Sequence, residues 1–178
     1  MTTQDLSRRP RTVSSEEGSS LIETCAALGL VLIVMAGLMS MDAVATTITE
    51  NSGHLSARTA EYAQDKMEQL LALAYGDATS NTAVFPATPA GGTGLAQGGS
   101  SDAAAPAAGY VDYLDQNGNL LVASGTTAPT GWFYKRVWLV EIPSTNLKQI
   151  TVSVTVARGF GRAMPPTSTV AVLKSFPF

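Results

Sequence analysis

The stretch Gly18-Ser19-Ser20-Leu21-Ile22-Glu23 comes directly before an uncharged run, Thr24 to Met41. As a helix rising about 1.5 Å per residue, the run is about 27 Å long, close to the hydrocarbon thickness of a bilayer. Glu23 stands at its start, where a carboxylate in lipid costs up to roughly 3 kcal/mol and needs a partner. The stretch therefore predicts a membrane helix that begins at an acidic side chain.

The order of glycine, serine and a glutamate four residues after the serine resembles the cleavage site of type IV prepilins. In that family a prepilin peptidase cuts after the glycine, and a glutamate is the fifth residue of the mature chain. The resemblance implies cleavage between Gly18 and Ser19, N-methylation of Ser19, and an assembly role for Glu23, whose carboxylate would pair with a neighbour's free amine in a low-dielectric helix bundle. The residues alone also fit a signal-anchor helix with an interfacial glutamate.

Residues 1–18 are therefore expected to be a leader peptide. Arginines precede the run, and the first basic residue after it is Arg58, which predicts that the N-terminus is cytoplasmic and the C-terminus lies outside. The resemblance implies that the membrane is an inner membrane and the C-terminus periplasmic, and that the subunit then enters a pilus or periplasmic filament. A competing interpretation is a secretory signal cut after Ala43-Val44-Ala45, which would leave Thr46 as the first residue. The apolar run is long for the core of such a signal.

Composition excludes several classes of protein. The 178 residues carry a net charge of −3, which gives no electrostatic footprint for nucleic acid. The single cysteine, Cys25, lies in the apolar run and cannot form an internal disulfide. The single histidine, His54, has no second histidine or thiol outside the run to complete a metal or nucleophilic site. We therefore expect no cofactor and no enzyme activity.

The chain between Pro10 and Pro86 contains no other proline, which predicts one helix over residues 19–76 with a transmembrane part at 21–41. Gly29 and Gly37 in the run fit either close helix packing or a segment that loosens in a filament. The second half has an apolar stripe and a charged face, and Gly76 is expected to end the helix as a left-handed cap. The stripe is Ala63, Met67, Leu70, Leu71 and Ala74, and the charges expected on another face are Glu61, Asp65, Lys66 and Glu68.

Residues 77–109 are rich in Ala, Gly, Ser, Thr and Pro, and we expect a surface loop or an inert linker without strands. Residues 110–178 change to a period of two, which predicts an antiparallel meander packed on the helix, an α+β fold. The resemblance to type IV prepilins implies that this is the pilin ladle fold. The expected strands are Tyr110–Leu114, Leu120–Ala123, Trp132–Ile142, one around 150–156, and Thr169–Phe176.

Acidic and amide side chains gather around the first predicted turn, and Asp112, Asp115 and Asn117 are weak candidates for a calcium site. The glycine at Gly118 does not match the spacing of an EF-hand loop. Asn117-Gly118 is instead a strong signal for a hairpin turn, and we favour that interpretation.

Three later segments narrow the resemblance. The end of the helix around 63–77 and the strands around 134–138 and 147–152 resemble minor pilins of the PilV kind and I-type minor pseudopilins of type II secretion. The resemblance implies a structural filament subunit whose partners are prepilin peptidase, other pilin or pseudopilin subunits, an inner-membrane assembly platform and, before assembly, membrane lipid. The alternative is a membrane-anchored exported binding domain that does not polymerise. A third option is an anchored enzyme, which needs a cleft with convergent polar groups.

Overall fold

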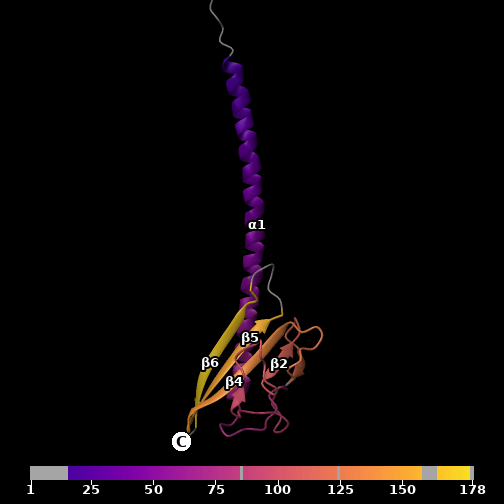
Figure 1. Cartoon of the computed structure of the whole chain (residues 1–178), viewed down its shortest axis with the longest axis vertical. Coiled ribbons are helices and arrows are strands. Elements are labelled where there is room, and N and C mark those ends of the chain that lie inside the picture. The colour runs from indigo at the N-terminus through magenta and orange to yellow at the C-terminus, as the bar shows by residue number, and fades with distance from the viewer. Residues whose placement is uncertain (1–15, 85, 124, 158–163, 177–178) are drawn as a thin grey trace, which may run out of the picture. The chain divides into compact units, whose positions relative to one another are not determined.

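The computed structural model describes residues 16–84, 86–123, 125–157 and 164–176 (Figure 1). The chain divides into two compact units, Met1–Thr46 and Thr47–Phe178. Helix α1, Glu16–Leu71, contributes to both units. The absence of proline from this stretch allows the helix, as the sequence predicts.

In the first unit, the described residues form only helix. Its apolar side chains are exposed on every side, including Leu30 at 66%, Ile33 at 70% and Met39 at 75%. A helix that is apolar all round matches a lipid or helix-bundle environment and not water.

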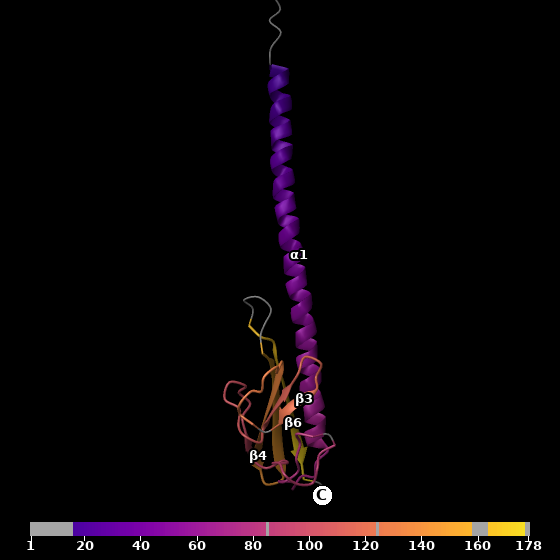
Figure 2. The ribbon, with the colours of Figure 1, turned by 90° about the vertical axis from the view of Figure 1, so that its right-hand side faces the viewer.

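The second unit is built on one six-stranded sheet (Figure 2). Its strands run in the order β3-β2-β4-β5-β6, with β1 also paired to β4, and every pairing is antiparallel. The bounds are β1 Gly98–Gly99, β2 Val111–Leu114, β3 Leu120–Ala123, β4 Tyr134–Ser144, β5 Leu147–Val156 and β6 Thr167–Ser175. One helix with an antiparallel sheet confirms the predicted α+β class.

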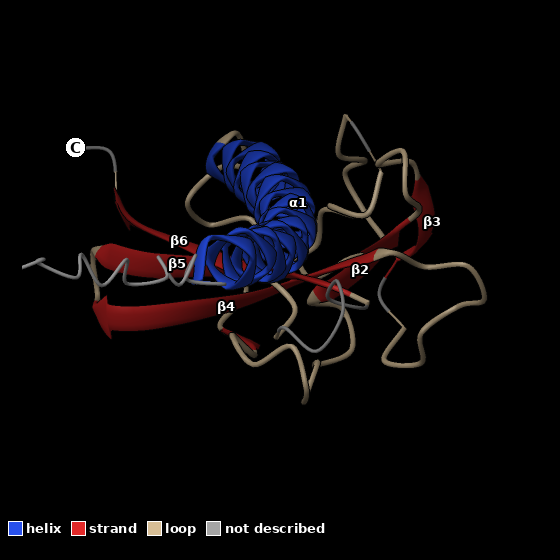
Figure 3. Cartoon of the chain, turned by 90° about the horizontal axis from the view of Figure 1, so that it is seen from above, coloured by secondary structure: helices blue, strands red, loops and turns tan. Residues whose placement is uncertain are grey.

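The core of this unit lies between the end of α1 and one face of the sheet (Figure 3). Ala63 and Leu70 of the helix are fully buried, as are Val152 and Val154 of β5. Alternation along β5 places its valines on the helix side and its hydroxyl residues on the other. A smaller cluster on the opposite face contains Val111, Tyr113 and Val137.

The structure confirms the predicted hairpin and changes the expected strand order and one strand end. The hairpin of β2 and β3 is confirmed, with Gly118 at a φ of +85° in its turn. The sheet is not a simple meander, because β4 pairs with β2 on the side away from β3. The predicted end of the long strand at Ile142 is wrong: β4 continues through Pro143 to Ser144 across a register shift, which tolerates a residue without an N–H.

The predicted helix end is wrong by five residues. Helix α1 ends at Leu71, and Gly76 is not among the residues with positive φ in the described chain. Ala74, expected on the apolar stripe, lies beyond the helix and is exposed. The helix has no basic residue in its last turn, and its C-terminal carbonyls are bound from the sheet: Lys174 Nζ donates to the oxygen of Leu71 at 2.6 Å and to that of Leu73.

The expectation of no strand in residues 77–109 is also wrong. Gly98 and Gly99 form β1 and pair with Val140 and Leu139 of β4, where β2 no longer covers that edge. Gly99 has a φ of +95°, and a Cβ there would lie 2.1 Å from the carbonyl oxygen of Trp138. Only glycine allows this approach. Leu95 is fully buried, so the segment adds to the core.

Candidate functional site

The predicted processing and assembly residues all lie on α1. Gly18 and Ser19 are in its first turns, and Glu23 follows on the same helix with an exposed side chain. Thr24 donates its hydroxyl to the carbonyl oxygens of Ser20 at 3.0 Å and Leu21 at 2.9 Å. This bonding leaves the hydroxyl no unmet donor in an apolar setting. Within the described residues, no ion pair involves Glu23.

Helix α1 has the length and composition of a membrane span. Residues Ser20–Leu71 contain an 18-residue window with mean hydropathy 2.3, none of it buried, and this is the single such candidate within the described residues. Length and composition alone support this assignment, and a signal sequence near the N-terminus has the same properties.

The second unit contains a buried ion cluster that sequence reasoning missed. Lys66 Nζ lies 2.8 Å from Asp112 Oδ2, and both side chains have no exposed surface. Arg136 Nη2 lies 2.9 Å from the same oxygen, and Arg136 Nη1 lies 2.8 Å from Asp65 Oδ2. The two cations and two carboxylates balance, which is what burial of charge requires. The cluster joins α1 to β2 and β4.

Lys66 is placed differently from the prediction that it faces away from the apolar stripe. Its ammonium also donates to the carbonyl oxygen of Thr82 and lies 4.2 Å from the ring centroid of Trp138. Burial lowers the pKa of Lys66 to about 8, and the neighbouring Asp112 carboxylate opposes part of that shift. The spacing of Lys66 could have predicted its burial, because it is three residues after Ala63 and four before Leu70, on the buried face.

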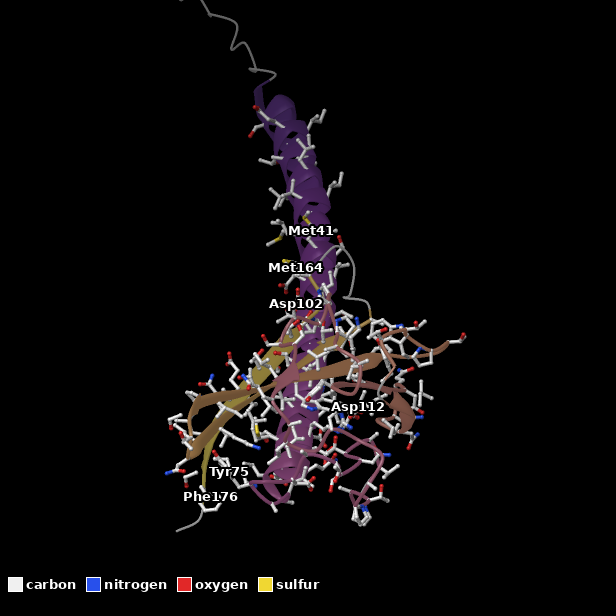
Figure 4. The ribbon with its side chains drawn as sticks, turned by 60° about the horizontal axis from the view of Figure 1, so that its bottom comes forward. Met41, Tyr75, Asp102, Asp112, Met164 and Phe176 are labelled. Atoms are coloured by element: carbon white, nitrogen blue, oxygen red, sulfur yellow. The ribbon has the colours of Figure 1, made fainter. Side chains whose placement is uncertain are left out.

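The calcium candidates are engaged elsewhere. Asp112 belongs to the buried cluster and lies inside the second unit (Figure 4). Asp115 accepts hydrogen bonds from the backbone N–H groups of Asn117 and Asn119, both at 2.8 Å, and from the Asn119 amide at 2.9 Å. These contacts close the hairpin turn. Among the residues described, no three His, Cys, Asp or Glu side chains are grouped to hold a metal ion.

Two lysines of the sheet bind the segment that follows α1. Lys148 Nζ donates to the carbonyl oxygens of Tyr75 and Leu95, both at 2.7 Å, and Lys174 binds the last carbonyls of the helix. Tyr75 also stacks edge-on against Phe176 with ring centroids 5.3 Å apart (Figure 4). Burial lowers the pKa of Lys148 and Lys174, while Asp77 opposes the shift at Lys148. These contacts hold the end of the helix and the segment after it against the sheet.

A shallow cavity of about 260 Å³ opens beside the ion cluster. It is lined by Asp65, Gln69, Ala83, Val84, Leu114, Gly118, Leu120 and Arg136. Its two charged groups already bind each other, so the lining presents no nucleophile beside a general base. The cavity gives no reaction chemistry to propose.

Fold and sites together define a chain with an apolar N-terminal helix and an α+β head whose architecture is pilin-like. Comparison with known protein families, with curated proteins and with solved structures finds no match.

Proposed function

We propose that the protein is a structural subunit, a minor pilin or pseudopilin, of a type IV pilus or a type II secretion filament. The observation that carries the proposal is the first unit: an apolar helix with an acidic residue, Glu23, at its start and a glycine–serine pair just before it. The head supports the proposal, because its own helix half and sheet satisfy each other and leave the first unit for contacts outside the chain.

The exposed apolar surface suits both a membrane and a filament. Burying one leucine or isoleucine side chain is worth about 2 kcal/mol, and this helix exposes many of them. Lipid covers them in the inserted subunit, and neighbouring helices cover them after assembly. Lipid tails are as apolar as leucine, so hydrophobicity alone does not choose between these states.

Pairing of Glu23 favours the filament over the membrane. A carboxylate held in an apolar bundle is costly unless it is paired, and the new α-amine at Ser19 of a neighbouring subunit is a cation at the right depth. The pair sets the register between subunits. In this proposal prepilin peptidase cuts after Gly18, Ser19 is N-methylated, and an inner-membrane platform assembles the subunits with the head on the periplasmic side. The role is structural and not catalytic.

Mass spectrometry of the protein isolated from its membrane tests the processing step. We expect a chain that begins at Ser19 with one added methyl group. A chain that begins at Thr46 would replace the proposal with a secretory signal, and one that still begins at Met1 would contradict cleavage altogether.

Substitution of Glu23 tests assembly. We expect Glu23→Gln to be inserted and cleaved but to be lost from filaments, because the neutral amide no longer pairs with the amine. Glu50→Gln, on the same helix beyond the apolar run, is the matched control and should assemble normally. Normal incorporation of Glu23→Gln would favour the alternative, a membrane-anchored binding domain that does not polymerise.

A further inference from the structure

Residues 47–53, Thr47-Ile48-Thr49-Glu50-Asn51-Ser52-Gly53, are helical within α1. We propose that this segment is a joint: a stretch of helix that opens and closes in the membrane-inserted monomer and so lets the head reorient on its anchor. The inference rests on the proposed membrane insertion of residues 21–41, and it adds a conformational device that does not depend on cleavage or filament assembly.

The composition of residues 47–53 disfavours a helix. Threonine and isoleucine lose side-chain freedom in a helix, and asparagine and serine compete for its backbone groups. Gly53 adds the largest backbone entropy cost. Glu50 is the one good helix former among the seven. With alanine at Thr47, Thr49, Ser52 and Gly53, the helix would be favoured roughly a hundredfold more.

Burial in the head does not compensate for this composition. Residues 47–50 and Gly53 are exposed, and Asn51 and Ser52 are half-buried. The first buried side chain after the division between the units is Leu55. Most helices in proteins are held by tertiary packing of an apolar face and not by propensity. In residues 47–53, burial is limited to the half-buried Asn51 and Ser52, and the helix propensity is low.

No close contact within the described chain requires a glycine at position 53. Its φ is outside the left-handed region, and a Cβ at this position would meet no atom within 4 Å. Alanine would therefore fit within this chain, and glycine weakens the helix relative to alanine. The segment contains no proline, so it is not a fixed kink. A weak but unbroken helix is the arrangement that opens reversibly.

Hydrogen exchange on the full-length chain in lipid nanodiscs measures the opening directly. We expect the amides of residues 47–53 to exchange at least about tenfold faster than those of residues 59–67, which are held by the core. The variant T47A/T49A/S52A/G53A should slow exchange in the segment about a hundredfold. Gly53→Ala alone should slow it about fivefold, which provides a milder test if the fourfold variant inserts poorly.

The matched control carries the same kinds of substitution in the apolar run: T24A/G29A/G37A should leave exchange in residues 47–53 unchanged. Exchange in the wild-type segment as slow as in residues 59–67 would overturn the joint, and so would a fourfold alanine variant with unchanged rates. These readouts need neither a cut at Gly18 nor a filament. Failure of the proposed function would instead appear as a mature chain that does not begin at Ser19.

Discussion

The two halves of α1 are both helical, but their apolar side chains lie in opposite environments. In residues 20–46 the apolar side chains are exposed all round, whereas in residues 55–71 an apolar stripe is buried on the sheet. The second half is held by its own fold, whereas none of the apolar window in the first half is buried within the described chain. Helicity is therefore a poor guide to what stabilises a helix.

Their charges differ in the same way. In the second half, Lys66 is matched by Asp112 inside the chain at 2.8 Å. In the first half, Glu23 makes no ion pair within the described residues. A buried charge needs a partner, and the head supplies one for Lys66. In the function proposed above, Glu23 finds its partner in a neighbouring subunit.

Removal of the central carboxylate should give the largest effect on the self-contained half. Asp112→Ala leaves Lys66 and Arg136 buried without their shared acceptor, and we expect a loss of about 3 to 5 kcal/mol in unfolding free energy. Urea unfolding of the full chain in detergent, followed by tryptophan fluorescence, measures it. Asp65→Asn is the control and should cost under about 1 kcal/mol, because the Asp65 side chain is 54% exposed.

The same unfolding experiment, applied to a variant in the exposed half of α1, tests whether the two halves are independent. Leu30→Ala removes a large apolar side chain from the exposed half and should leave the urea midpoint of the head unchanged. A shift as large as that of Asp112→Ala would contradict the division into an independent head and a dependent anchor.

The stability of the head should rise with pH above 8. The pKa of Lys66 is lowered from 10.5 to about 8 in the fold, so between these values the unfolded chain binds more protons than the folded one. Unfolding free energy then increases with pH, by on the order of 2 kcal/mol between pH 8 and pH 9.5. Lys66→Met removes this group, and the difference between the two proteins should appear in urea titrations over that range. An identical pH dependence in both would contradict a buried, titrating Lys66.

Lys174→Met should loosen the end of the buried half with a smaller cost. The substitution removes the ammonium that binds the carbonyl oxygen of Leu71 at 2.6 Å, and we expect a loss of about 1 to 2 kcal/mol. Hydrogen exchange should accelerate in the last turn of α1 and not around Ala63. Uniform acceleration along the helix would show that Lys174 acts on global stability instead.

Gly76→Ala should have the smallest effect, within about 0.5 kcal/mol. The residue lies outside the left-handed region, and a Cβ there would meet no atom within 4 Å. Thermal unfolding checks this value. A loss above about 1 kcal/mol would restore the interpretation of Gly76 as a left-handed helix cap.

Local rules predicted the parts of the fold that depend on neighbours in sequence. Proline spacing gave the helix, alternation gave β5, and Asn117-Gly118 gave the hairpin turn. The same rules misplaced the end of the helix, because it is set by Lys148 and Lys174 from distant strands. They missed β1 because two glycines carry no period.

The candidate functional residues also fall into two groups, those found from sequence order and those found only in the fold. Gly18, Ser19 and Glu23 are recognised by their order in the chain, and nothing in the fold is needed to find them. The ion cluster needed the fold, because Lys66, Asp112 and Arg136 are far apart in sequence and their types alone predict solvated side chains.

The sequence by itself determined that this chain has an apolar N-terminal helix and an alternating C-terminal sheet, because periodicity and proline placement act over a few residues. Only the tertiary structure decided which charges are buried, where α1 stops and how residues 77–109 enter the core. Those outcomes depend on contacts between distant segments, and the free energy of a buried charge or an unpaired carbonyl depends on what the fold places beside it.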